Sequence, residues 1–261
     1  MVPHSTAFCF FEPMNKAIAF LFITAIFCCT SSFKSFPVYS KSDLLGQLEP
    51  EKHPAYSRVP DAYTTQSTFL RTEALEAFLK MHRAAQKAGV NLYIVSGTRN
   101  RARQIEIWME KWNRFTGDTL ERLEEILQYS SMPGTSRHHW GTDFDLNSVD
   151  SAYFETADGA KIYAWLAENA FDYGFYQPYV KKGEARQNGY REEKWHWSYY
   201  PISNQMLRAY KRVVSYRDIR GFAGSNYAER LNVIGHFVEG LPDFYAQNLE
   251  YFETAAENAS E

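Results

Sequence analysis

The sequence predicts an α+β fold in which helices pack around a small, mainly antiparallel sheet. Apolar residues recur at helical spacing between residues 68 and 87. Residues 193–199 alternate like a strand and are rich in Trp and Tyr. With 45% hydrophobic and 23% charged residues, the 261-residue chain can bury a substantial core. Its length suits one domain with additions, or two small domains.

The first 32 residues are typical of a signal peptide or a lipoprotein signal. Lys16 precedes an apolar run over residues 17–29, and this run is shorter than the about 20 residues that a membrane span needs. All three cysteines lie within residues 1–29, so cleavage after residue 32 would leave no disulfide. Cys28 or Cys29 could instead carry a lipid and anchor the protein to a membrane. We expect a secreted or cell-envelope (periplasmic) protein, whether or not it is lipid-anchored.

Residues 33–66 are expected to form a linker or a wrapping arm, because they are polar, punctuated by prolines and without sustained periodicity. A helix is predicted from Thr68 to Lys87, where the apolar positions fall on one face. Gly89 is expected to end this helix. A strand over residues 90–95 should follow and lead into the next polar motif.

The remaining elements follow from the same patterns. A second helix is predicted from Arg101 through Trp112, and residues 113–135 look helical and then loop-like. Another helix is expected near residues 161–169. Residues 201–261 have helical spacing but contain none of the candidate site residues, so we expect a helical C-terminal extension there.

Two motifs carry the residues that metal chemistry requires. The first is Ser-x-His-x-x-Gly-x-x-x-Asp over residues 136–145, and the second is Glu-x-Trp-His over residues 193–196. Hydrolytic zinc is typically held by three His or carboxylate ligands, and the fourth position holds a water whose pKa falls to about 7. His138, Asp145 and His196 can supply those three ligands. The two motifs together therefore indicate a catalytic zinc site.

Glu193 is the natural general base of such a site. A carboxylate beside a metal-bound water can take its proton and later pass it to the departing amine. Strict alternation along residues 193–199 would send Glu193 and His196 to opposite faces of the strand. We therefore expect a bulge, or a turn entering the strand near Glu193, that brings both side chains to one place.

These motifs, together with Ser96-Gly97-Thr98-Arg99 upstream, resemble those of the VanY-type zinc D-alanyl-D-alanine carboxypeptidases. That family belongs to a wider metallopeptidase superfamily whose fold is shared with hedgehog signalling domains. Gln104 stands at the family's spacing after the arginine, and Tyr173-Gly174-Phe175 are also similar to the family. The resemblance covers roughly residues 66–200 and implies a zinc peptidase domain over residues 67–200.

The resemblance also implies a role for each polar residue of the motifs. The three candidate ligands would bind Zn²⁺ and Glu193 would activate the water. Arg99 would steady the oxyanion of the tetrahedral intermediate, whereas Ser136 and Gln104 would contact the substrate. Taken alone, Arg99 belongs to a basic cluster over residues 99–103 that is typical of a solvated helix start.

Other residues stand beside those of the two motifs. Asp143 stands where many relatives carry a small apolar residue, and if it faces the metal it could alter substrate preference or stiffen the groups around the ligands. His139 adjoins a candidate ligand but is out of phase with the motif, so we do not expect it to bind metal. Trp140, Trp197 and Tyr199 could line a substrate cleft.

The predicted function is the trimming of peptidoglycan stem peptides by a zinc-dependent D-alanyl-D-alanine carboxypeptidase. A formal net charge of −3 gives no broad basic surface and little support for a nucleic-acid partner. An L,D-carboxypeptidase and a peptidoglycan endopeptidase remain open on the same fold. A non-catalytic, zinc-stabilised module that binds cell-wall peptides also remains open. A binding module could lose Glu193 and Arg99 freely, so their presence favours an enzyme.

Overall fold

The computed structural model describes residues 39–242 of the chain. The signal expected at residues 1–32 lies outside these residues, and so does the end of the expected C-terminal extension. Within residues 39–242, no helix is long and apolar enough to cross a membrane. The domain boundaries set out above remain predictions.

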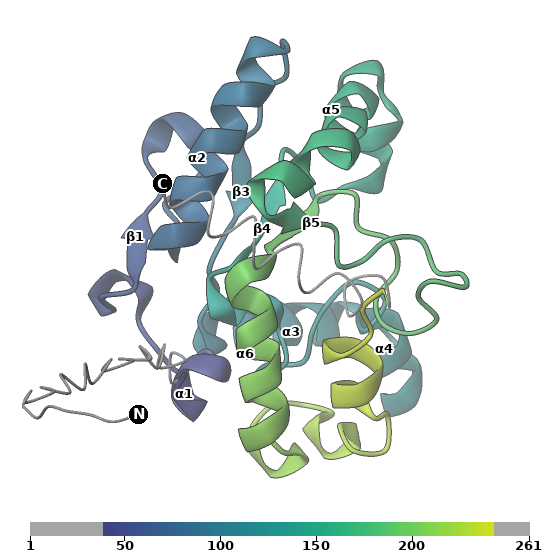
Figure 1. Ribbon diagram of the computed structural model, residues 1–261. Helices are drawn as coiled ribbons and strands as arrows, with labels where there is room; N and C mark the ends of the chain where they lie inside the picture. Colours follow the sequence, from purple (N-terminus) through teal and green to yellow (C-terminus); the bar gives the residue numbers. More distant parts are fainter. Residues whose placement is uncertain (1–38, 243–261) are drawn as a thin grey trace, which may run out of the picture. The chain divides into compact units, whose positions relative to one another are not determined.

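A four-stranded antiparallel sheet lies at the centre of the described residues, with its strands in the order β3-β4-β6-β5 (Figure 1). These strands are β3 (Ile94–Ser96), β4 (Asp143–Leu146), β5 (Phe175–Tyr176) and β6 (His196–Tyr199). A separate antiparallel pair is formed by β1 (Tyr56–Arg58) and β2 (Phe69–Arg71). All pairs of neighbouring strands run antiparallel, so the predicted α+β fold with a small, mainly antiparallel sheet is confirmed.

Helices surround this sheet. The α-helices of the described residues are α1 (Lys41–Leu44), α2 (Thr72–Lys87), α3 (Arg101–Arg114), α4 (Thr119–Ile126), α5 (Ala157–Asn169) and α6 (Tyr200–Val213). Short 3₁₀ helices are η1 (Pro50–Lys52), η2 (Asp61–Tyr63), η3 (Arg137–Trp140), η4 (Ser151–Glu155), η5 (Ala170–Tyr173), η6 (Tyr216–Asp218) and η7 (Ser225–Tyr227), and η8 (Ile234–Val238) is a π-helix.

Three of the four hydrophobic clusters in the described residues join the main helices to the sheet and to one another. The first joins α2 and α5 to the sheet, and in it the rings of Phe78 and Phe144 meet edge to face with centroids 5.4 Å apart. The second joins α1 and α6 to η3 through Trp140 and Tyr210. The third joins α3 and α4 to the segment after α6, around the fully buried Trp108. In Figure 1, α2 and α5 lie on one side of the sheet region, and α3, α4 and α6 lie toward the other.

Local sequence explains where α3 and α4 begin. The Asn100 side chain accepts a hydrogen bond from the backbone N–H of Arg103 at 2.9 Å, which caps the start of α3. Asp118 and Glu121 form a capping box at the start of α4. The start of α3 agrees with the prediction, and the helix runs two residues beyond the predicted end at Trp112.

Two predicted elements start later in the structure than in the prediction. The helix expected from Thr68 begins at Thr72, because residues 69–71 pair with β1 as strand β2. The strand expected over residues 90–95 is confined to residues 94–96. In both places, contacts with distant parts of the chain override a local pattern.

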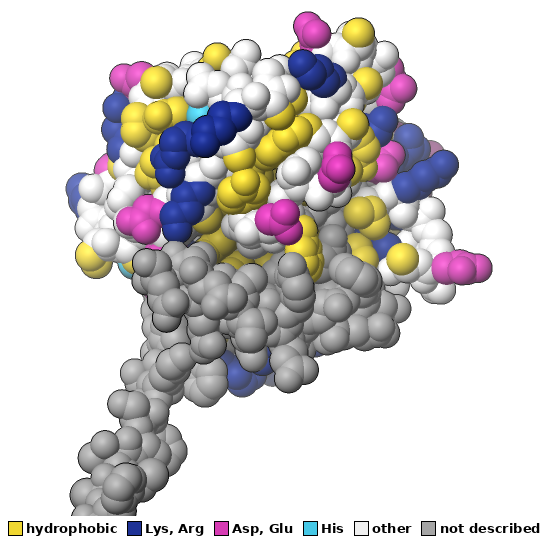
Figure 2. Space-filling model, turned by 45° about the horizontal axis from the view of Figure 1, so that its top comes forward, with side chains coloured by type: hydrophobic (Ala, Val, Ile, Leu, Met, Phe, Trp, Pro, Cys, Tyr) yellow, Lys and Arg dark blue, Asp and Glu magenta, His cyan; other side chains and the backbone are white. Residues whose placement is uncertain are grey.

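Charges of both signs are interspersed on the surface turned to the viewer in Figure 2, with hydrophobic side chains between them. No gathering of Lys and Arg by themselves dominates this part of the described surface. This view agrees with the small formal net charge of −3.

Candidate active site

Strand alternation places the core residues and the site residues on opposite faces of the sheet. The register pairs Phe144 with Trp197, and both side chains belong to the cluster under α2 and α5. The next pair is Asp145 with His196, whose side chains point to the opposite face. Asp143 shares that face, two residues before Asp145. The alternation of apolar and polar residues along β4 and β6 therefore brings the polar side chains together on one face of the sheet.

Three predicted ligands converge there. One ligand atom from each of His138, Asp145 and His196 lies within 4.8 Å of the other two. His138 Nε2 is 3.4 Å from Asp145 Oδ1, and His196 Nδ1 is 3.2 Å from the same oxygen. Two ligands bound tetrahedrally at about 2.1 Å from zinc would be about 3.4 Å apart. The spacing therefore suits a tetrahedral cation site.

Hydrogen bonds indicate which nitrogen of each histidine is available to a cation. His138 Nδ1 donates to the carbonyl oxygen of Gly97 at 2.8 Å, so Nε2 is left with its lone pair. Within the described residues, His138 Nε2 and Asp145 Oδ1 are buried without a hydrogen-bond partner. His196 Nε2 donates to Asp143 Oδ2 at 3.0 Å, which directs Nδ1 toward Asp145. Two buried atoms without hydrogen-bond partners suit a cation site.

The charges of the site favour a cation. Burial by itself would lower the pKa of His196, but the neighbouring carboxylates of Asp143, Asp145 and Glu193 raise this pKa well above 6.5. Burial by itself would raise the pKa of Asp145, but the two candidate ligand histidines hold it well below 3.8. The cluster thus keeps a carboxylate charged and recruits a proton to His196. A divalent cation would displace that proton on binding.

Glu193 reaches the same place through a turn, as the sequence predicted. Residues 194 and 195 form this turn before β6, and the His196 N–H donates to the Glu193 carbonyl at 3.2 Å. Glu193 Oε2 then lies 3.4 Å from His196 Nδ1. The Glu193 N–H donates to the carbonyl of Tyr179 at 2.9 Å, which fixes the backbone. Burial raises the pKa of Glu193 above its usual 4.5, as suits a group that takes up a proton.

Arg99 is tied to the metal motif through its backbone. Its N–H donates to the His138 carbonyl at 3.2 Å, and its carbonyl accepts from His139 Nδ1 at 2.6 Å. The other ring nitrogen of His139 accepts the N–H of Gly134 at 3.1 Å. Backbone groups thus occupy both nitrogens of His139, and this histidine orients Arg99 without joining the candidate ligands.

The two residues expected to contact substrate are less exposed than a contact role suggests. Gln104 donates to the Ser131 carbonyl at 2.9 Å, and its Oε1 is buried without a partner among the described residues. It lines a narrow recess of about 20 Å³ together with Arg99 and Glu193. Ser136 is 1% exposed, and among the described residues the lining of this recess does not include it. Their roles remain predictions.

A wider cleft of about 450 Å³ contains the part of the site that is open to larger ligands. It shares Arg99 and Glu193 with the narrow recess. Its lining also includes Asp145 of β4, Lys111 of α3, Ser151 of η4 and residues of three loops: Tyr129, Ser130, Val149, Asp150 and Trp195. The narrow recess is lined further by Tyr179 and Tyr190.

The aromatic residues predicted to line the cleft lie elsewhere. Trp140 is 1% exposed against α6, Trp197 is 3% exposed in the main core, and Tyr199 packs against that core. Period-two alternation already indicated this for Trp197, because it stands next to His196 on the strand. Lys111 and Tyr179 were missed, since neither stands near a motif in the sequence.

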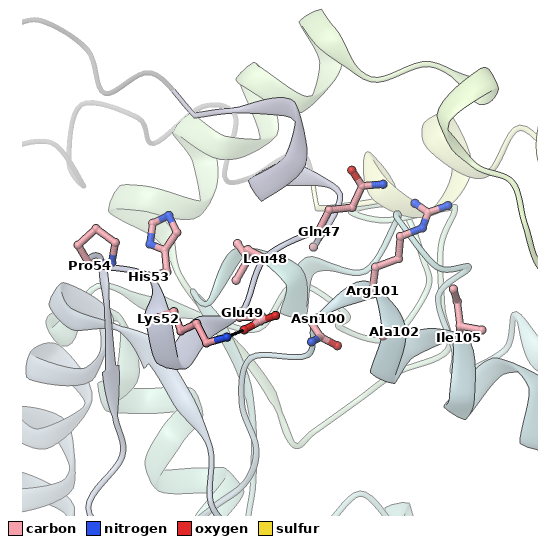
Figure 3. Close-up of a pocket in the computed structure, with 11 residues that line it drawn as sticks. Gln47, Leu48, Glu49, Lys52, His53, Pro54, Asn100, Arg101, Ala102 and Ile105 are labelled. Carbon is pink, nitrogen blue, oxygen red and sulfur yellow. Dashed lines mark ion pairs between the residues drawn. The ribbon is translucent and has the colours of Figure 1, made fainter.

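Another recess of about 750 Å³ lies between the loop after α1 and the start of α3 (Figure 3). Asn100 and Arg101 reach it from the segment that follows Arg99. Its Lys52 and Glu49 pair with each other, as the dashed line in Figure 3 marks. None of the candidate site residues is among its described lining residues, so volume alone does not locate the site.

Known proteins resemble this chain over the same region. The family model described as VanY, D-alanyl-D-alanine carboxypeptidase, matches residues 67–202. YodJ of Bacillus subtilis (strain 168), assigned as a carboxypeptidase, is 34% identical over 140 residues, which are 51% of this chain and 47% of YodJ. A D-alanyl-D-alanine carboxypeptidase of Enterococcus faecalis (strain ATCC 700802 / V583) is 30% identical over 122 residues, 46% of this chain and 44% of that protein.

A solved structure is also similar. The LdcB LD-carboxypeptidase aligns with a TM-score of 0.48 and 24% identity, over 70% of this chain and 80% of that one. The matches to the two curated relatives span slightly less than half of each relative's length. The matched region contains every residue predicted for the site.

Proposed function

The chain belongs to the VanY family of D-alanyl-D-alanine carboxypeptidases, as its motifs predicted, and from this premise we propose that it is a zinc-dependent carboxypeptidase of peptidoglycan stem peptides. The observation that carries the proposal is the convergence of His138, Asp145 and His196. Glu193 and Arg99 line the wider cleft together with Asp145, and the narrow recess together with His138 and His196. Export directed by residues 1–32, and action outside the cytoplasm, belong to the same proposal.

Each side chain has one task in this proposal. When bound, zinc would polarise the scissile carbonyl and lower the pKa of a water molecule. Glu193 takes a proton from the attacking water and returns it to the departing amine. Its raised pKa favours that exchange near neutral pH. Arg99 donates hydrogen bonds to the oxygen that becomes negative during attack, and a buried Arg99 Nε without a partner in the described residues supports this role.

The cleft supports cleavage at a free C-terminus. A carboxypeptidase must recognise a terminal carboxylate, whereas an endopeptidase need not. Lys111 lies in the cleft with Arg99, and its ammonium group donates a hydrogen bond to the neutral hydroxyl of Ser130. Burial, and next the nearby Arg99, lower the pKa of Lys111, as expected for two cations that face the same cleft. A substrate carboxylate would relieve this repulsion.

Bond specificity distinguishes the remaining alternatives. A D,D-enzyme removes the last residue of a pentapeptide stem, and an L,D-enzyme acts on the tetrapeptide. An endopeptidase would cut an internal cross-bridge, and a binding module would cut nothing. The residues of the site are compatible with either carboxypeptidase. The D,D reading rests on family membership.

The test uses the full chain loaded with zinc and three substrates: a muropeptide pentapeptide, a tetrapeptide and a cross-linked dimer. Products are read by mass. We predict loss of one alanine from the pentapeptide, and no such loss with Glu193→Ala. Glu192→Ala is the matched control, because it removes the neighbouring carboxylate, which is only half-buried. Loss from the tetrapeptide alone would shift the assignment to L,D cleavage. No cleavage of any substrate while zinc stays bound would contradict the enzymatic proposal.

A further inference from the structure

Asp143 contacts the candidate ligand His196 from the neighbouring strand. The register pairs Asp143 with Ser198 and Asp145 with His196, which makes Asp143 a diagonal neighbour of His196 on one face. Asp143 Oδ2 lies 3.0 Å from His196 Nε2, whereas His196 Nδ1 lies 3.2 Å from Asp145 Oδ1. The two carboxylates therefore engage opposite sides of one imidazole ring.

The Asp143 carboxylate is itself held in place on both oxygens. Oδ2 also accepts from Arg137 Nε at 2.8 Å. Oδ1 accepts from the hydroxyls of Thr142 at 2.7 Å and Ser198 at 2.8 Å. The side chain is 0% exposed, so no water competes for these positions. Asp143 is thus oriented by the protein and not by a bound cation.

Arg137 compensates the charge of the buried Asp143 carboxylate. It is 1% exposed, pairs with Asp143, and lies over the ring of Trp140 at 4.7 Å from the centroid. The pair carries no net charge. Asp143 can therefore accept a hydrogen bond from His196 without adding net negative charge next to Asp145. A carboxylate without the arginine would itself compete for a cation.

We propose that Asp143, held by Arg137, is a positioning residue that fixes the ring orientation and the protonated nitrogen of His196. In that orientation Nδ1 is the nitrogen presented to the metal. The inference rests on the proposed function, because it takes His196 as a metal ligand. A small apolar side chain at position 143 could not make this contact, so the orientation of the ligand depends on the carboxylate.

The test measures zinc affinity and needs no substrate. The full chain is freed of metal, and its dissociation constant for zinc is measured by competition with a chromophoric chelator. We predict that Asp143→Ala weakens binding by about 10–100-fold, the usual effect of removing a carboxylate bonded to a ligating histidine. Asp143→Asn keeps an acceptor for His196 Nε2, so its zinc affinity should fall less than that of Asp143→Ala.

Ser203→Ala is the matched control for loss of a buried polar group. The Ser203 hydroxyl is fully buried and lies 3.0 Å from that of Ser198, one step further from His196. We predict that this variant binds zinc as the wild type does. An affinity within about twofold of wild type for folded Asp143→Ala would overturn the inference. A wild type that binds no zinc would overturn the proposed function and this inference together.

A second measurement keeps the inference testable if Asp143→Ala does not fold. Nitrogen-15 spectra of histidine-labelled wild type, loaded with cadmium-113, report which ring nitrogen couples to the metal and which carries a proton. We predict a proton on Nε2 of His196 and metal coupling to Nδ1. In Asp143→Asn, weaker hydrogen bonding should shift the Nε2 resonance while the His138 signals stay in place. Coupling through Nε2 of His196, or an unchanged Nε2 resonance in the variant, would overturn the inference.

Discussion

The ring nitrogens of His138, His139 and His196 differ in their hydrogen-bond partners. His138 donates one nitrogen to a carbonyl, and His196 donates one to a carboxylate, so each has a nitrogen left for a cation. His139 has both nitrogens in contact with backbone groups. Neighbours distant in sequence, and not the motif alone, therefore separate a candidate ligand from a structural histidine.

His139 should make the protein sensitive to acid. Burial lowers the pKa of His139 to about 3. Its folded pKa lies below the unfolded value of about 6.5, so its stabilising effect is complete above pH 6.5 and is lost as the pH falls toward 3. In that window we predict that His139 reduces the free energy of unfolding by about 1.4 kcal/mol per pH unit.

Denaturant unfolding of the metal-free protein between pH 7 and pH 4 checks this effect. His139→Asn should make the dependence of stability on pH shallower. The control is His236→Asn, because His236 is exposed and its replacement should leave the slope unchanged. An identical slope in His139→Asn and the wild type would contradict the prediction.

Lys111 should affect substrate binding and not the chemical step. If its ammonium group binds the terminal carboxylate, Lys111→Met should raise KM about 10-fold or more, as loss of a charged hydrogen bond does, and leave kcat nearly unchanged. A pentapeptide with an amidated C-terminus serves as the second substrate. The wild type should cut this amidated substrate poorly, and Lys111→Met should not weaken its binding further. A fall in kcat with constant KM would instead place Lys111 in the reaction itself.

At the scale of elements, β4 and β6 arrange most of the site. Alternation placed Phe144 and Trp197 in the core and left Asp145 and His196 facing each other. The meeting of Asp145 and His196, and the turn before β6, could be predicted from the sequence, whereas the prediction that Trp197 lines the cleft was wrong. The late start of α2 could not be predicted, because residues 69–71 read as helix until β1 is placed beside them.

Gly141 joins η3 to β4 and so sets the spacing between two ligands. Its φ is +71°, and an added Cβ would meet the Tyr56 ring and lie 3.1 Å from the Thr98 hydroxyl. We predict that Gly141→Ala lowers the free energy of unfolding by about 2 kcal/mol or more. Zinc affinity should fall as well, since His138 and Asp145 flank this turn.

Thermal and denaturant unfolding measure the cost of this substitution. Gly183→Ala is the matched control, because nothing lies within 4 Å of the added Cβ at that position. It should stay within about 0.5 kcal/mol of wild type. Equal stability of the two alanine variants would show that the turn tolerates a side chain.

At the scale of the whole molecule, segments that carry no candidate site residue form hydrogen bonds with the residues around the site. Trp140 donates to the Leu44 carbonyl at 3.2 Å, and Tyr210 of α6 donates to the Gly134 carbonyl at 2.8 Å. Both carbonyls lie outside the three candidate metal ligands. These contacts join parts of the chain that are far apart in sequence, so no local pattern could predict them. The convergence of His138, Asp145 and His196 could be predicted because the spacing within each of the two motifs is local.

The central claim is that one bound zinc makes this chain a carboxypeptidase. The most direct measurement adds zinc stepwise to the metal-free full chain and follows release of alanine from a pentapeptide. We predict that the rate rises linearly to one zinc per chain and then stays constant. His196→Ala should show no such rise. A protein that binds zinc at the His138, Asp145 and His196 site but releases no alanine at any zinc level would contradict the claim.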